Sequence, residues 1–339
     1  SSPMTAPTFI NARDPIIDNL RAVAIIFMVI WHSLMWFSTL HCYPQAACAP
    51  PQALFWQIVY YPGSLWSVPL FYFSSGMTLM ININRGKTTQ IWRRSLSLLL
   101  FGYLFTSFIM GINQTLHAWV LQSIAAGLLI TLLFHRWIRG GVGILLLLAC
   151  CVSILNISHQ VSTPDFALAA GLLAYLREGF QALLINGAFP VFPWIGFIAL
   201  GVIWQSATER LRRWLLRLAV MVLAMPFFLP VEKYPLSPGY LLFFSGLCIL
   251  LASSIGLVVR WINRYWDIGI LQKGATLLSR YSLEIFVIHY ALGHMASVYL
   301  PTLKLPIFYS VLPGFGLLML SLMVLAGWTR FRESLIAMG

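Results

Sequence analysis

The chain contains 339 residues, of which 60% are hydrophobic and 9% are charged, and its mean hydropathy is +0.84. Soluble globular domains carry about 25% charged residues, so this composition excludes an ordinary soluble domain and predicts an all-α, polytopic integral membrane protein. The formal net charge of +12 would favour a nucleic-acid partner in a soluble protein. In a membrane protein, Lys and Arg gather in cytoplasmic loops, so no nucleic-acid partner is expected.

Apolar runs long enough to cross a bilayer, about 20 residues each, recur ten times along the chain. They cover approximately 20–39, 54–82, 95–111, 118–134, 142–157, 186–206, 214–230, 239–259, 282–300 and 306–328. The second run contains Pro62, Gly63 and Pro69 and is predicted to be tilted or broken. Residues 4–339 are expected to form one membrane-embedded domain, with residues 1–3 interpreted as an expression scar.

Positive charges predict the orientation of these spans. A cytoplasmic N-terminus leaves only Arg177, Lys233 and Lys304 of the 21 basic residues outside, which favours an even number of spans and two cytoplasmic termini. The expected location is a bacterial-type inner membrane, or an endomembrane in a eukaryote. Segment 158–185 is long enough for an interfacial helix, and the basic segment 260–281 is expected to lie along the membrane surface.

The first span carries three ionisable side chains, Asp18, Arg21 and His32. Arg21 and His32 are eleven residues apart, which is roughly 16 Å and close to three turns of a helix, so both project from nearly the same face. Asp18 lies within side-chain reach of Arg21. Ionisable groups in hydrocarbon point to a functional site, and a neutral histidine can accept a proton near pH 7. The alternative is a buried histidine bonded to a neighbouring helix.

Four segments resemble one superfamily of membrane acyltransferases. Residues 17–25, IDNLRAVAI, resemble the opening LDxLRGxAI pattern of the acyltransferase-3 family, with Ala22 where glycine is usual. Residues 71–76, FYFSSG, and 281–289, YSLEIFVIH, resemble its FFxxSG and YSxxIYLxH segments. Residues 189–201, FPVFPWIGFIALG, resemble the FPxxPWxGFxxxG segment of heparan-α-glucosaminide N-acetyltransferase-like proteins. The resemblance identifies the superfamily and leaves its branch open.

The resemblance implies a cytoplasmic acetyl-CoA donor and an extracytoplasmic acceptor, a hydroxyl or amine of a glycan or glycolipid. Cations at the inner mouth would hold the phosphates of coenzyme A; the candidates are Arg21, Arg85, Lys87, Arg93 and Arg94. Ser75, in the small-residue run before Gly76, is a candidate for close passage of the pantetheine arm. Close helix packing explains the same run equally well.

Within this interpretation, His32 is the expected general base. An acyl-histidine intermediate is the alternative, because histidine also acts as a nucleophile. Arg21 would position the coenzyme or polarise the thioester, and Asp18 would orient Arg21 or tune His32.

Glu284, at the start of the ninth span, is expected to join this charged cluster, since an intramembrane carboxylate needs a partner. His289, deeper in that span, and Trp66 and Trp194, beside Pro and Gly, are candidates for acceptor binding. For His289, a structural role beside the base and the role of the base itself are the alternatives. For both tryptophans, an interface-belt or packing role is the alternative.

No sequence motif for a metal site is visible, and no metal is expected. A proton- or ion-coupled transporter would also bury such charges, but no pair of corresponding broken segments in two halves supports it. A non-enzymatic scaffold would leave the charges of the first span unexplained.

Overall fold

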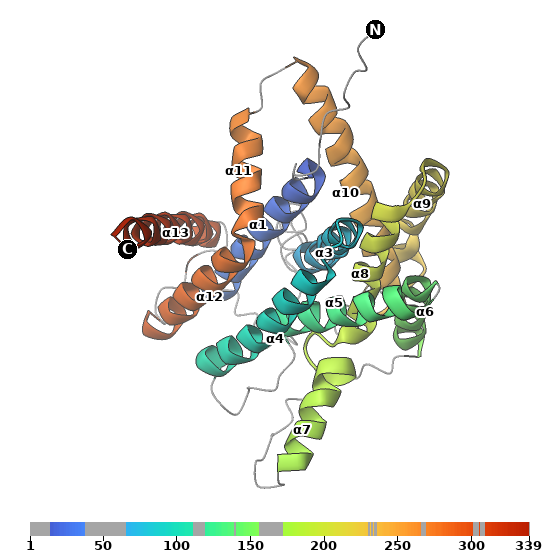
Figure 1. Ribbon diagram of the computed structural model, residues 1–339, viewed down its shortest axis with the longest axis horizontal. Helices are drawn as coiled ribbons and strands as arrows, with labels where there is room; N and C mark the ends of the chain where they lie inside the picture. Colours follow the sequence, from blue (N-terminus) through green and yellow to red (C-terminus); the bar gives the residue numbers. More distant parts are fainter. Residues whose placement is uncertain are drawn as a thin grey trace.

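The computed structural model describes residues 14–37, 66–110, 119–138, 140–155, 172–229, 231, 233, 236–265, 269–300, 305 and 309–338, and the regular elements within these ranges are helical (Figure 1). The elements are α1 (Pro15–Phe37), α3 (Ser67–Asn84), α4 (Thr88–Met110), α5 (Val120–Trp137), α6 (Gly141–Ile154), α7 (Leu172–Gln181), η4 (Ala182–Asn186), α8 (Val191–Ser206), α9 (Glu209–Val222), η5 (Met225–Phe227), α10 (Pro238–Tyr265), α11 (Gly269–Arg280), α12 (Ser282–Tyr299), η6 (Tyr309–Val311) and α13 (Leu312–Met338). The all-α prediction is confirmed.

Helices occur at each of the ten apolar runs and in both segments expected at the membrane surface. Among the residues that the structure describes, four helices are long and apolar enough to cross a membrane: Pro15–Phe37, Val120–Trp137, Pro238–Val259 and Tyr309–Phe331. Leu176–Asn186 and Val191–Ser206 meet that test together and are bent by 50°, which would bring the number to five. The expected break in 54–82 falls partly outside the described residues, which resume at Trp66.

Helix α9 differs from the apolar run predicted at 214–230. It begins at Glu209, where the Thr208 side chain accepts a hydrogen bond from the backbone N–H of Leu211 at 3.4 Å. It ends at Val222 and is followed by the short helix η5. At 1.5 Å per residue, α9 is about 21 Å long, which is shorter than a hydrocarbon core of about 30 Å.

Helix α1 starts where local chemistry favours a helix. Pro15 occupies the first helical position, where its missing N–H costs nothing. The Asp14 carboxylate accepts a hydrogen bond from the backbone N–H of Ile16 at 2.9 Å, which is a typical N-terminal cap. This cap fixes the register that places Arg21 and His32 along the helix.

Helix α1 is the central element of the fold and contacts α3, α10, α11, α12 and α13. Figure 1 shows it between the orange helices α11 and α12 and the teal helix α3. One buried cluster joins α1 to α3, α8, α9 and α10, and a second joins it to α12 and α13. A third cluster, built from α3, α5, α6, α8 and α10, lies beyond α3. The first half of α1, up to Ala24, and its second half, from Ile25, therefore meet different sets of helices.

Candidate active site on helix α1

Two histidines from distant parts of the sequence meet beside the buried cluster of α1, α12 and α13. Nδ1 of His32 on α1 lies 2.9 Å from Nε2 of His289 on α12, and Nδ1 of His289 lies 2.7 Å from the carbonyl oxygen of Ile285. His289 is fully buried, whereas His32 is half-buried. The structure thus brings together the candidate base and a histidine predicted to bind the acceptor.

Aromatic side chains hold the His32 ring on two sides. Trp36 stacks on it with 5.3 Å between ring centroids and 25° between planes, and Tyr290 meets it edge-on at 5.1 Å and 88°. Trp36 itself packs directly on Gly293 of α12, where an added Cβ would overlap the indole ring. The absence of a side chain at Gly293 therefore determines where Trp36, and with it His32, lies.

Arg21 and Asp18 lie one turn apart on α1 and make hydrogen bonds to two different helices. The Arg21 guanidinium donates to the hydroxyls of Ser74, at 3.4 Å, and Thr78, at 3.1 Å, on α3. The Thr276 hydroxyl of α11 donates to the Asp18 carboxylate at 3.0 Å, and Asp18 is only 3% exposed. These hydrogen bonds join α1 to α3 and to α11.

The remaining cations predicted to bind coenzyme A lie at one end of the molecule. Arg85, Lys87, Arg93 and Arg94 are exposed around the turn between α3 and α4. Because Arg21, near the start of α1, contacts Thr78 in the second half of α3, this turn and the start of α1 lie at the same end of the molecule. This end of the molecule thus combines four exposed cations with the half-buried Arg21, and such cations can bind the several phosphate groups of coenzyme A.

Ser75, Glu284, Trp66 and Trp194 lie in three different settings. Glu284 is exposed in the first turn of α12, where its negative charge interacts favourably with the helix dipole. Ser75 and Trp66 are half-buried on or beside α3, and the Trp66 ring meets Phe27 edge-on at 6.2 Å. Trp194 is 1% exposed in the core. Its ring packs against the rings of Tyr72, Phe189, Phe197 and Tyr240.

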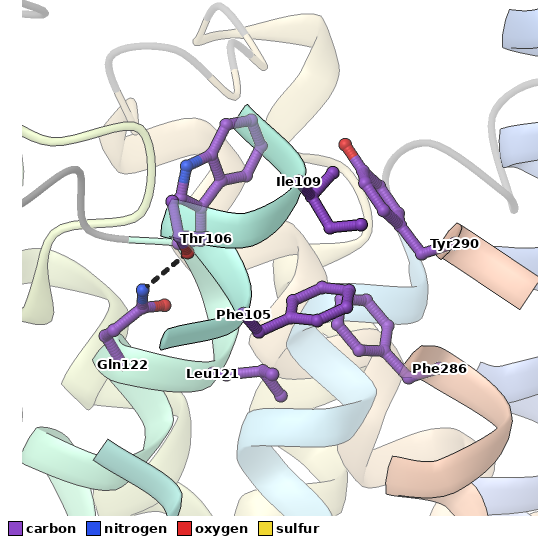
Figure 2. A pocket seen from close by; sticks show the side chains of 8 residues that line it. Phe105, Thr106, Ile109, Leu121, Gln122, Phe286 and Tyr290 are labelled. Atoms are coloured by element: carbon purple, nitrogen blue, oxygen red, sulfur yellow. Dashed lines mark hydrogen bonds between the residues drawn. The ribbon is translucent and has the colours of Figure 1, made fainter. Parts of the chain in front are cut away.

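A crevice next to the histidine pair opens between α4, α5 and α12 (Figure 2). The space between its walls, open solvent included, is about 320 Å³. It is lined by Phe105, Thr106, Ile109, Trp119, Leu121, Gln122, Phe286 and Tyr290. Its walls are mainly apolar and aromatic. One of the lining residues, Tyr290, also packs against the His32 ring.

Two buried polar atoms on the lining residues have no hydrogen-bond partner, Oε1 of Gln122 and Nε1 of Trp119. The Gln122 amide nitrogen donates to the Thr106 hydroxyl at 2.8 Å (Figure 2), and that hydroxyl donates in turn to the Gly102 carbonyl. Unpaired buried polar atoms are uncommon in proteins, so this wall offers one acceptor and one donor to a ligand. The sequence patterns did not indicate this crevice.

Lys233 is a second feature that the sequence patterns did not assign to the site. It lies in the segment between η5 and α10, its ammonium is 5.4 Å from the centre of the Phe189 ring, and its charge interacts with His32. Burial lowers the pKa of Lys233 to about 7. The sequence did contain an indication that Lys233 is unusual. It is one of three basic residues predicted on the extracytoplasmic side, whereas Lys and Arg generally gather on the cytoplasmic side.

A family comparison identifies the class of protein. The model of the catalytic region of heparan-alpha-glucosaminide N-acetyltransferase matches residues 13–224, more than half of the chain. The chain belongs to this family. A comparison with curated proteins gave no match. The match includes Asp18, Arg21, His32 and the segment 189–201, and it selects the branch that the sequence motifs left open. His289 lies beyond it.

The family and the apolar helices together indicate a membrane acetyltransferase. In the part of the chain that the structure describes, no group of three or more His, Cys, Asp or Glu side chains that could hold a metal ion occurs. The arrangement offers an imidazole whose Nδ1 is held by His289, a nearby crevice and a cationic end of the molecule.

Proposed function

We propose that the protein transfers an acetyl group from cytoplasmic acetyl-CoA to an amine or hydroxyl of a glycan on the other side of the membrane, with His32 as the general base. The observation that carries this proposal is the position of His32, half-buried between helices on the same helix as Arg21. The family name favours an amino group as the acceptor. The two ends of α1 would then serve the two substrates.

In the chemical step, the acceptor nitrogen or oxygen attacks the carbonyl carbon of the thioester while its proton passes to His32. The carbon–sulfur bond breaks, and the coenzyme A thiolate leaves and takes up a proton, which His32 can return. A general base in this role contributes typically about 10²- to 10⁴-fold to the rate. An acyl-histidine would form on the same ring and is the less direct route.

Donor binding is assigned to the cationic end of the molecule. Arg85, Lys87, Arg93 and Arg94 would bind the phosphates of coenzyme A, and Arg21 would act at the inner end of this path. The distance of roughly 16 Å along α1 from Arg21 to His32 would be covered by the pantetheine arm, which would pass Ser75. Asp18, bonded to Thr276, would keep this part of α1 in place.

The topology proposed with this function has ten spans and two cytoplasmic termini, because the excess of Lys and Arg places Arg21 inside. The membrane is an inner membrane in a bacterium and an endomembrane in a eukaryote. His32 then lies towards the extracytoplasmic half of α1.

Acceptor binding is assigned to the crevice beside Tyr290. Sugars present apolar C–H faces and polar groups, and the crevice combines the rings of Phe105 and Phe286 with the unpaired Oε1 of Gln122. Trp66, half-buried beside α3, remains a candidate for this role. The burial of Trp194 and of His289 favours supporting roles for both side chains. Glu284, exposed at the start of α12, would act only as a charge at the helix start.

The experiment uses the full chain in proteoliposomes, with radiolabelled acetyl-CoA on the side of the N-terminus and a glucosamine-terminated oligosaccharide on the other. Acetylated oligosaccharide is expected, and His32→Gln should lower its rate of formation at least 100-fold. Coenzyme A binding should be unchanged in this variant. Arg21→Gln should instead weaken coenzyme A binding, whereas Arg217→Gln, at an exposed position on α9, should change neither quantity.

A His32→Gln variant that transfers acetyl groups at the wild-type rate would overturn the assignment of the base. Saturable solute uptake into the vesicles without coenzyme A binding would favour the alternative function, a proton- or ion-coupled transporter that uses the same charged residues.

A further inference from the structure

We infer that His289 is a positioning residue that fixes the tautomer of His32, so that Nδ1 of His32 carries the hydrogen and Nε2 is the atom that takes the acceptor's proton. This inference rests on the proposed function for its consequence in catalysis. Its structural content, a single tautomer at each ring, is independent of that function.

The hydrogen-bond chain permits one assignment for a pair of neutral rings. The carbonyl oxygen of Ile285 can only accept, so Nδ1 of His289, 2.7 Å away, must carry its hydrogen. A neutral imidazole has one N–H and one lone pair, so Nε2 of His289 must accept. Nδ1 of His32, 2.9 Å from that atom, must therefore donate, and Nε2 of His32 keeps the lone pair.

The packing prevents the His32 ring from turning over. Trp36 covers one face of the ring, and Tyr290 meets it edge-on from another side. His289, which supplies the hydrogen bond, is fully buried, whereas His32 is half-buried. No residue that the structure describes makes a hydrogen bond to Nε2 of His32. The ring that is locked in place is thus the inner one, and the reactive nitrogen is on the outer one.

The chain also prepares His32 for the charge that it gains. When Nε2 of His32 takes up a proton, the imidazolium still donates from Nδ1 to the lone pair of His289, so no hydrogen bond has to rearrange during the step. Hydrogen bonds that involve a charged donor are about twice as strong as neutral ones. His289 in this way does for His32 what a carboxylate does in other general-base histidines, without a negative charge in the membrane.

Two amides of different length separate this role from simple packing. The side-chain oxygen of His289→Gln reaches the position of Nε2 and can accept from His32, whereas His289→Asn reaches only the position of Nδ1. Gln is expected to keep the transfer rate within about tenfold of the wild type, and Asn to lower it about 100-fold. The KM for acetyl-CoA should stay the same in both, because His289 of α12 contacts α1 at His32, eleven residues away from Arg21.

A spectroscopic measurement tests the tautomer without reference to activity. Protein with ¹⁵N-labelled histidine rings, in lipid nanodiscs, should give a protonated Nδ1 and an unprotonated Nε2 for His32, assigned by the loss of these signals in His32→Gln. The same two nitrogens should exchange character, or give mixed populations, in His289→Asn but not in His289→Gln.

A protonated Nε2 in wild-type His32 would overturn the inference, as would equal transfer rates for His289→Gln and His289→Asn in correctly folded protein. These outcomes differ from failure of the proposed function, in which His32→Gln itself leaves acetyl transfer intact. If the function fails, the nanodisc spectra still decide the tautomer.

Discussion

The interface between α3 and α8 and the interface between α1 and α12 are built in different ways. At the first, Gly76 lies against the carbonyl oxygen of Ile198 and Gly201 against that of Phe73, so two backbones touch. At the second, imidazole and aromatic side chains fill the space, with His32, Trp36, His289 and Tyr290 in mutual contact. The first interface is formed by backbone contacts at glycines, and the second by contacts between large side chains.

This difference indicates that the α3–α8 interface has a structural role and the α1–α12 interface a chemical one. Small residues allow membrane helices to pack by close backbone contact, which leaves no room for adjustment. Polar side chains between membrane helices carry hydrogen bonds and protons, and are typical of functional sites. The structure thus uses α3 and α8 as a fixed support for the first half of α1, and places the histidine pair on its second half, where α12 packs.

The largest effect is expected at the backbone contact. Gly76→Ala would place a Cβ on the carbonyl oxygen of Ile198, and because neither backbone can move aside, we expect a loss of about 3 kcal/mol of stability. The measurement is the thermal unfolding midpoint and the yield of folded protein in detergent. Gly274→Ala on α11, where nothing lies within 4 Å of the added Cβ, is the matched control. Equal stability of the two variants would contradict the framework role of α3 and α8.

An intermediate effect, on activity more than on stability, is expected at the side-chain contact. Gly293→Ala would push on the Trp36 ring, which can shift, but Trp36 stacks on His32. We expect folded protein with acetyl transfer lowered at least tenfold, since a misplaced base loses its orientation. Gly316→Ala on α13, with open space around the added Cβ, should transfer at the wild-type rate. If Gly293→Ala were as unstable as Gly76→Ala, the contrast between the two interfaces would be wrong.

The smallest effect is expected where α11 holds the start of α1. Thr276→Val keeps the shape of the side chain and removes the hydrogen bond to the buried Asp18 carboxylate. Because hydrogen bonds to charged groups contribute about 1.5–3 kcal/mol, we expect a loss of about 1.5 kcal/mol, measured as a lower unfolding midpoint. Thr329→Val on α13 loses only a bond to a carbonyl of its own helix and should unfold close to the wild type. An unchanged midpoint for Thr276→Val would show that α11 contributes nothing at this contact.

Much of the site could be predicted because it is local in the sequence. The spacing of Arg21 and His32 on one helix follows from helical geometry alone, and the four motif segments led to the family that the comparison then identified. Two features of the site could not be predicted from the sequence, the exposure of one side chain and the position of the crevice. Glu284 was expected near the charged cluster, and the structure places it exposed in the first turn of α12, an exposure that its sequence position did not indicate. The crevice at Gln122 depends on three helices that no local pattern relates to one another.

The sequence by itself determined that the chain is a helical membrane protein of the acyltransferase superfamily, with a histidine and an arginine on its first apolar helix. Hydrophobic runs, helical periodicity and charge placement are properties of short segments, so they can be read directly. Only the tertiary structure decided which side chain His32 would meet. The contact with His289 joins residues 257 positions apart in the sequence, and it depends on how α12 packs on α1, a result of all the contacts around both helices.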